Sequence, residues 1–182
     1  MRAGEAPVVF GSSYEALVRV MGDKLDADFN AKLKAQGVDI TAIHAAYPYE
    51  TWVQSLELAM AKLWPNASHI ERTYNMGRAM FESWGHTLMG RALLPLLRLL
   101  GPKRGVERMT RNFRSSNNYA ETKVTSRGPT QYEVWLNLVA FPHYYRGLLE
   151  AGLTASGAKE AKVEVLSHAP AGAAVLLLSW AP

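Results

Sequence analysis

The chain has 182 residues, of which 48% are apolar and 20% charged, and this composition predicts one globular domain spanning 1–182 rather than a disordered chain. Its formal net charge of +4 is modest, which argues against nucleic acid as a partner. Because the chain has no cysteine, disulfides, thiol nucleophiles and thiolate metal sites are excluded.

The apolar segments are too short to cross a membrane. The longest, at 92–100 and 173–180, fall well below the roughly 20 residues that span a bilayer. The N-terminal segment 1–11 lacks the apolar core of a secretory signal. We therefore expect a soluble, cytoplasmic protein with no membrane span.

Apolar residues at helical spacing predict three helices in the first 65 residues. The first begins at a cap formed by Ser12 or Ser13. The second ends at Gly37, which suits the left-handed residue after a helix. The third runs from Tyr49 until Pro65 stops it.

The next helix begins with a capping box, in which the side chains of Ser68 and Glu71 satisfy the first turn. It is expected to run on into segment 91–100, which is apolar nearly all round and is therefore predicted to be the central buried helix. Pro95 predicts a kink or a break within it. The pair Gly101–Pro102 ends this helix and begins another.

After residue 118 the hydrophobic period changes from helical to two. It predicts strands at 119–125 and 131–139, a helix from Pro142 to Gly157, and strands at 161–167 and 173–180 around a turn at 168–173. The predicted fold is therefore α+β: an N-terminal helical bundle (about 12–114) packs on a C-terminal antiparallel sheet (about 118–180) of strand-strand-helix-strand-strand order.

The polar residues form no recognisable catalytic or metal-binding pattern. The five histidines do not fall at the spacing that metal sites use. Ser83 and His86 are one helical turn apart, but no nucleophile elbow and no well-placed acid accompany them. We therefore expect no catalytic residue, no metal, no cofactor and no enzymatic activity.

A cluster of arginines is the most distinctive charged feature. On a helical wheel, Val106, Met109 and Phe113 share one face of segment 103–114. The arginines on the other faces are Arg104, Arg108, Arg111 and Arg114. These arginines are consistent with a solvated helix face. They are also consistent with a binding site for an anion, such as a nucleotide, an anionic lipid or an acidic protein patch. The Ser-Ser-Asn-Asn run 115–118 would add hydrogen-bond donors to such a site.

Three segments, 46–59, 88–122 and 144–168, resemble a family of uncharacterised proteins from myxobacteria that is known only as a domain of unknown function. This resemblance implies no activity. The second half of the chain is also similar to the heme nitric-oxide/oxygen-binding domains, the four-vinyl-reductase-type sensor domains and the Bet3-type trafficking subunits. These relatives imply helices followed by the same sheet, with an apolar ligand space between them.

The heme-binding relatives hold heme with a helical histidine and a strand that reads tyrosine-x-serine-x-arginine. The corresponding strand of this chain keeps only Tyr132, because Val134 and Leu136 replace the serine and the arginine. His86 lies on a helix upstream, but farther from Tyr132 than in those relatives. The resemblance therefore implies that this chain has the fold of the heme-binding relatives but does not bind heme.

The space between helix 91–100 and the sheet is predicted to be an apolar pocket or a tightly filled core. Its expected walls are Trp84, Leu93, Leu97, Val134 and Tyr145. The leading hypothesis is a non-catalytic sensory or adaptor (signalling) domain that binds an apolar or amphipathic small molecule there. The alternatives are an anion- or nucleotide-second-messenger-binding module that uses segment 103–114, and a structural protein-interaction domain. We expect a homodimer with a small-molecule or protein partner.

Overall fold

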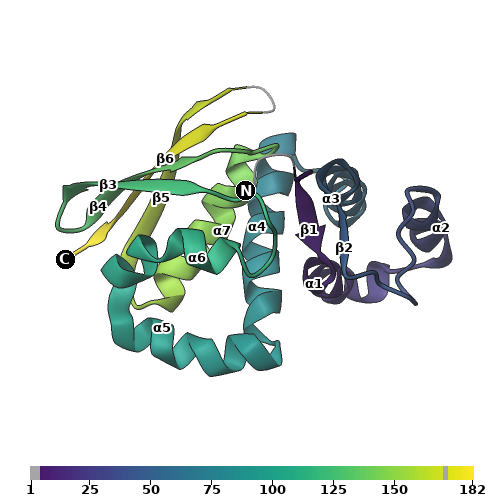
Figure 1. Ribbon diagram of the computed structural model, residues 1–182, viewed down its shortest axis with the longest axis horizontal. Coiled ribbons are helices and arrows are strands. Elements are labelled where there is room, and N and C mark those ends of the chain that lie inside the picture. Colours follow the sequence, from purple (N-terminus) through teal and green to yellow (C-terminus); the bar gives the residue numbers. More distant parts are fainter. Residues whose placement is uncertain (1–4, 170–171) are drawn as a thin grey trace.

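The computed structural model describes residues 5–169 and 172–182 and has an α+β fold (Figure 1). In chain order its elements are β1 (Val8–Phe10), α1 (Gly11–Met21), the 3-10 helix η1 (Gly22–Lys24), α2 (Ala27–Ala35), β2 (Ala46–Pro48), α3 (Tyr49–Leu63), α4 (His69–Gly85), α5 (Leu88–Glu107), α6 (Met109–Phe113), β3 (Thr122–Gly128), β4 (Gln131–Leu136), α7 (Pro142–Ala155), β5 (Lys159–His168) and β6 (Ala174–Ala181). The predicted strand-strand-helix-strand-strand order is confirmed. The turn predicted at 168–173 includes residues 170 and 171, which lie outside the described residues.

The four-stranded sheet is antiparallel throughout and has the order β3-β4-β6-β5. Alternate residues of its two central strands face the protein interior. Val134 pairs with Leu176, and Tyr132 pairs with Leu178; all four side chains are buried. Helix α7 packs on this inner face. Every second side chain of the strands points toward α7, and together these apolar side chains form one buried layer beneath the helix.

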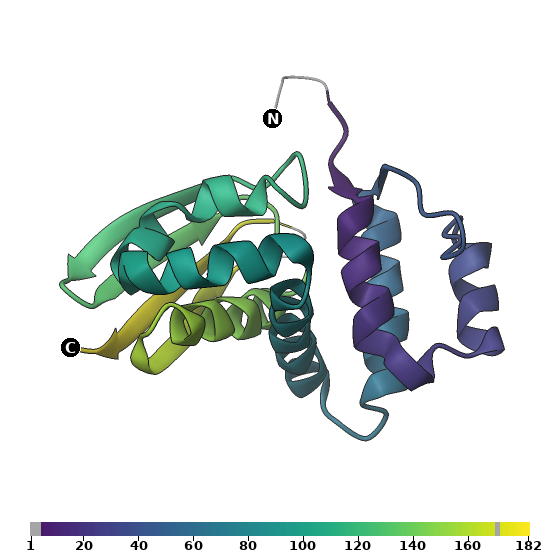
Figure 2. The ribbon, with the colours of Figure 1, turned by 90° about the horizontal axis from the view of Figure 1, so that it is seen from below.

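Helices α4 and α7 are packed with their backbones in contact. A β-carbon at Gly77 would lie 1.9 Å from the carbonyl oxygen of Tyr144, and one at Gly147 would lie 2.1 Å from that of Tyr74. Glycine is therefore needed on both helices. On its other side α4 packs against α1 and α3, so α4 joins the N-terminal helices to the sheet-bearing part (Figure 2).

The predicted capping box is confirmed at the start of α4, where the Ser68 hydroxyl accepts from the Glu71 backbone and the Glu71 carboxylate accepts from the Ser68 backbone. The caps predicted at Ser12 and Ser13 are wrong. Helix α1 begins at Gly11, and its N-cap residue is Phe10, whose side chain cannot accept a hydrogen bond. Gly11 lies against the backbone of the 43–45 loop, where a β-carbon would be 2.3 Å from a carbonyl oxygen.

The prediction that segment 91–100 forms the central buried helix is wrong. Helix α5 begins separately from α4, with the Thr87 hydroxyl accepting from the backbone of Gly90, and it lies at the periphery of the molecule (Figure 1). Leu99 is 83% exposed and Leu96 is 46% exposed. The glycine-mediated contact of α4 with α7 occupies the central position instead, which leaves only one side of α5 to be covered.

The kink or break predicted at Pro95 is wrong, whereas the interruption predicted at Gly101–Pro102 is confirmed. Pro95 stays within the helix, where its exposed position allows water to satisfy the carbonyl group that the ring leaves unpaired. Gly101 has φ 74° and ψ 170°, a conformation that favours glycine, and Pro102 then restarts the helix. A second interruption at Arg108 separates α5 from α6, so the basic segment 103–114 is not one helix.

Candidate functional site

An apolar cavity of about 110 Å³, open to solvent on one side, lies between α5, α6 and α7 and reaches β6 of the sheet. Its lining includes Leu97 and Val106 of α5, Met109 of α6, Leu149 and Leu153 of α7, and Leu178 of β6. These side chains offer a ligand dispersion contacts and almost no polar groups. The cavity therefore suits an uncharged, apolar molecule.

Two of the lining positions are glycines, which helps to keep the space open. A β-carbon at Gly105 would lie 3.4 Å from a methyl carbon of Leu97, and one at Gly152 would lie 3.4 Å from the ring of Phe81. Both distances are ordinary van der Waals contacts, so neither glycine is required by a clash. Small residues at these two points leave volume unfilled between the helices.

The five side chains expected to wall a pocket are spread over the second half of the fold. Leu97 is in the cavity lining. Leu93 is 38% exposed, and Val134 is fully buried beneath α7 in the core of the sheet. Trp84 is half-buried and packs on Phe81, which itself lines the cavity. The fifth, Tyr145, borders a different and smaller space.

That smaller space, of about 20 Å³, is surrounded by four tyrosines: Tyr49, Tyr119, Tyr144 and Tyr145. It has room for about one water molecule. Burial raises the pKa of Tyr145 to about 12 and also raises the pKa of the other three. The hydroxyl groups therefore stay protonated at neutral pH.

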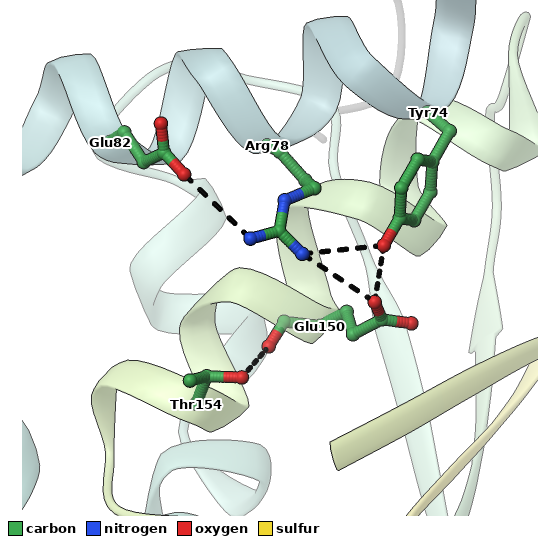
Figure 3. A network of polar contacts seen from close by, with 5 residues as sticks. All are labelled: Tyr74, Arg78, Glu82, Glu150 and Thr154. Carbon is green, nitrogen blue, oxygen red and sulfur yellow. Dashed lines mark hydrogen bonds and ion pairs between the residues drawn. The ribbon is translucent and has the colours of Figure 1, made fainter. Parts of the chain in front are cut away.

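A polar network links α4 to α7 beside their glycine contacts (Figure 3). The Tyr74 hydroxyl donates to the Glu150 carboxylate, and Arg78 lies 3.7 Å from Glu150 and 3.8 Å from Glu82. The guanidinium of Arg146 lies over the Tyr74 ring, 4.8 Å from its centre. These opposite charges compensate one another, so the network fixes two cavity-lining helices relative to each other. Sequence reasoning missed it because Arg146 and Glu150 of α7 are far along the chain from their partners on α4.

The basic residues predicted to bind an anion lie on the outer side of α5 and α6. Arg104, Arg108 and Arg111 are exposed, and within the described ranges they form no ion pair. Arg114 lies 3.9 Å from Glu121. Val106 is buried on the opposite side, as the helical wheel predicted. These arginines therefore do not face the cavity.

The hydrogen-bond donors expected from the 115–118 run are largely used within the fold, since the Ser116 hydroxyl donates to the carbonyl oxygen of Phe113 and the Asn118 amide nitrogen donates to that of Ala6. Acceptors of the run are used as well. The carbonyl oxygen of Ser116 accepts from the backbone of Phe10. The Asn118 amide oxygen accepts from the backbone of Val8, and the Asn117 amide oxygen accepts from the backbone N–H groups of residues 119 and 120. This run ties the N-terminal strand to the connection before β3, which was not foreseen.

The structure carries no metal-site or membrane-span feature within residues 5–169 and 172–182. No group of three or more histidine, aspartate or glutamate side chains is arranged to hold a metal ion there. No helix in this part of the chain is long and apolar enough to cross a membrane.

Solved structures of H-NOX proteins share this fold. The Fe(II) unliganded H-NOX protein from K. algicida superposes with a TM-score of 0.66 at 12% identity, covering 95% of this chain and 97% of that chain. An oxygen-binding H-NOX domain related to soluble guanylate cyclases gives a TM-score of 0.60 at 12% identity, covering 94% and 95%. At such identities the likeness establishes the fold alone, and it confirms the resemblance to the heme nitric-oxide/oxygen-binding (H-NOX) domains noted in the sequence.

Comparison of sequences identifies the family of this chain. No curated protein matches this chain. Residues 7–181 match a family model described as "Protein of unknown function (DUF2378)". Because that match covers nearly the whole chain, the protein belongs to the DUF2378 family.

Proposed function

We propose that this protein is a non-catalytic sensory or adaptor domain that binds a small apolar molecule in the cavity between α5, α6, α7 and β6. The observation that carries the proposal is an apolar, incompletely filled space within a fold shared with H-NOX proteins, one of which is described as binding oxygen. The proposed role of the domain is to couple occupancy of this space to the packing of the helices around it.

The size of the cavity limits the occupant. A volume of about 110 Å³ is well below the roughly 300–1,000 Å³ of pockets that hold drug-sized ligands. Dry cavities of roughly 150 Å³ lined by apolar side chains bind benzene or xenon. A charged or strongly polar molecule would lose its hydration here without gaining hydrogen bonds. The proposed ligand class is therefore a diatomic gas or an apolar molecule of a few heavy atoms.

A porphyrin does not fit the residues of this chain, although one structure with this fold is described by its heme redox potential. Val134 and Leu136 stand where the heme-binding strand has serine and arginine, and both are fully packed in the core of the sheet. His86 is exposed at the end of α4. The cavity is also far too small for such a group. The proposed ligand is therefore bound directly by the apolar side chains.

Gly105→Ala tests the proposal by narrowing the cavity without unfolding the protein. The added methyl group makes an ordinary contact with Leu97, and alanine is favoured over glycine inside a helix by about 0.5–1 kcal/mol. We expect the variant to be slightly more stable than the wild type. We also expect it to bind xenon or benzene more weakly, measured by ¹²⁹Xe NMR and by the ligand-induced rise in melting temperature.

Thr154→Ala provides the matched control, because this exposed residue of α7 does not line the cavity. It should leave the uptake of xenon and benzene unchanged. If the wild-type protein takes up neither probe, the space is a filled core and the proposed function is wrong. Equal uptake by the wild type and Gly105→Ala would place the binding elsewhere in the molecule.

The exposed arginines favour a second candidate function, binding of an anion such as a nucleotide second messenger. Arg104, Arg108 and Arg111 lie close together in the chain without ion-pair partners among the described residues. Replacing all three with glutamine should change the free energy of unfolding by less than about 0.5 kcal/mol per site. Nucleotide binding, measured by isothermal titration calorimetry, should be lost in this variant. Severe loss of stability would contradict the exposed placement of these side chains.

A further inference from the structure

One side of α5 exposes an apolar stripe, which we define as Ala92, Pro95, Leu96 and Leu99. These residues recur at spacings of three and four, so they share one helix face. All four are exposed, and Leu99 is 83% exposed. Figure 1 shows α5 at the edge of the molecule, with no other element beyond it. Exposed leucines clustered on one helix face mark an interaction surface more often than scattered ones do.

The stripe lies within a strongly basic segment. Residues 91–111 contain six lysines and arginines but only one acidic residue, so the segment carries more positive charge than the +4 of the whole chain. Arg91 and Arg98 border the stripe along one side of the helix, and Lys103 and Arg104 follow it; all four are exposed. Within the described part of the chain these cations have no carboxylate partner.

This combination of charge and apolarity selects among the surfaces that could cover the stripe. A second copy, docked by two-fold symmetry, would bring two patches flanked only by positive charges against each other and would be repelled. A soluble anion would pair with the arginines but would leave the leucines in water. A bilayer that contains anionic lipids satisfies both groups, because phosphates contact the arginines while the acyl boundary takes up the leucines.

We propose that α5 docks this protein on the surface of a membrane containing anionic lipids, with the apolar stripe lying in the interface and the flanking arginines on the headgroups. The contact is peripheral, because the stripe spans only two turns of helix. It is also separate from the cavity, since Leu97, the residue of segment 91–100 that lines the cavity, points to the opposite side of α5.

Vesicle co-sedimentation of the intact chain tests the proposal. The protein should bind vesicles of phosphatidylcholine with about one third phosphatidylglycerol, and bind vesicles of phosphatidylcholine alone far more weakly. Leu96→Ser with Leu99→Ser keeps every charge, and Arg91→Gln with Arg98→Gln keeps the stripe. Each pair should weaken binding about tenfold or more. Because all four side chains are exposed, circular dichroism should show native folding in both variants.

Leu166→Ser is the matched control, since Leu166 is a 50% exposed leucine on β5, away from the stripe. This variant should bind anionic vesicles as the wild type does. Failure of the wild type to bind them would overturn the proposal. So would binding that depends on the arginines but not on the leucines, because it would indicate a simple anion site. Dimers seen by analytical ultracentrifugation and dissolved by the leucine pair would show instead that a second copy covers the stripe.

Discussion

Gly77→Ala and Gly147→Ala should each lower the free energy of unfolding by about 3 kcal/mol, near the upper end of the usual cost of overpacking. The added carbon would lie 1.9 Å from the Tyr144 carbonyl oxygen in the first variant and 2.1 Å from that of Tyr74 in the second. Both obstacles are backbone atoms, which cannot rotate away. The helices must therefore separate, and the packing between α4 and α7 must be lost.

A glycine-to-alanine change at another position of α7 serves as the control, because it has the intrinsic effect of alanine on helix stability without the backbone clash. Gly152→Ala places its methyl group 3.4 Å from the Phe81 ring, an ordinary contact, so its stability should equal or exceed that of the wild type. Urea denaturation measures all three variants on one scale. Equal stability of Gly147→Ala and Gly152→Ala would show that the two backbones are not in contact.

Leu178→Ala should be the second severe substitution, with a loss of about 3 kcal/mol. Leu178 is fully buried, lies on a central strand of the sheet, and contributes to the cavity wall. Leucine-to-alanine changes in cores cost about 2–5 kcal/mol, because apolar burial is lost and a void remains. In this protein the new void adjoins the existing space of about 110 Å³, so the two should merge into one larger cavity.

The enlarged cavity gives this variant a distinctive response to ligand. Benzene binds the native state and not the unfolded chain, so it should raise the melting temperature, and the rise should be larger for Leu178→Ala than for the wild type. Differential scanning calorimetry with and without saturating benzene measures both effects. If Leu178→Ala is destabilised but benzene does not raise its melting temperature, the surrounding helices have collapsed into the space instead of keeping it open.

In the H-NOX-like fold of this protein, the central strand β4 carries tightly packed interior side chains. Tyr132 stacks on Trp180, with the two ring centres 5.6 Å apart. Val134 and Leu136 extend the apolar layer beneath α7. The strand thus serves packing here, and the apolar space of the candidate site is bounded by α5, α6, α7 and β6.

Much of the secondary structure was predictable because its causes are local. The capping box at Ser68, the left-handed glycine at 101 and the period-two strands each depend on residues within a few positions of one another. The inward faces of Val106 and Met109 followed from helical spacing in the same way. Part of the candidate site, including Leu97, was therefore visible in the sequence.

The tertiary structure alone decided which helix is central and where space remains unfilled. The leucines of segment 91–100 surround the helix, so their pattern could not show which side would be covered or that Leu99 would remain in solvent. The contact of Gly77 with α7, the cavity beside Gly105, and the use of Asn117 and Asn118 to hold the N-terminal strand all join residues distant in the chain. Such contacts depend on how whole elements approach one another, and periodicity within one element carries no information about its neighbours.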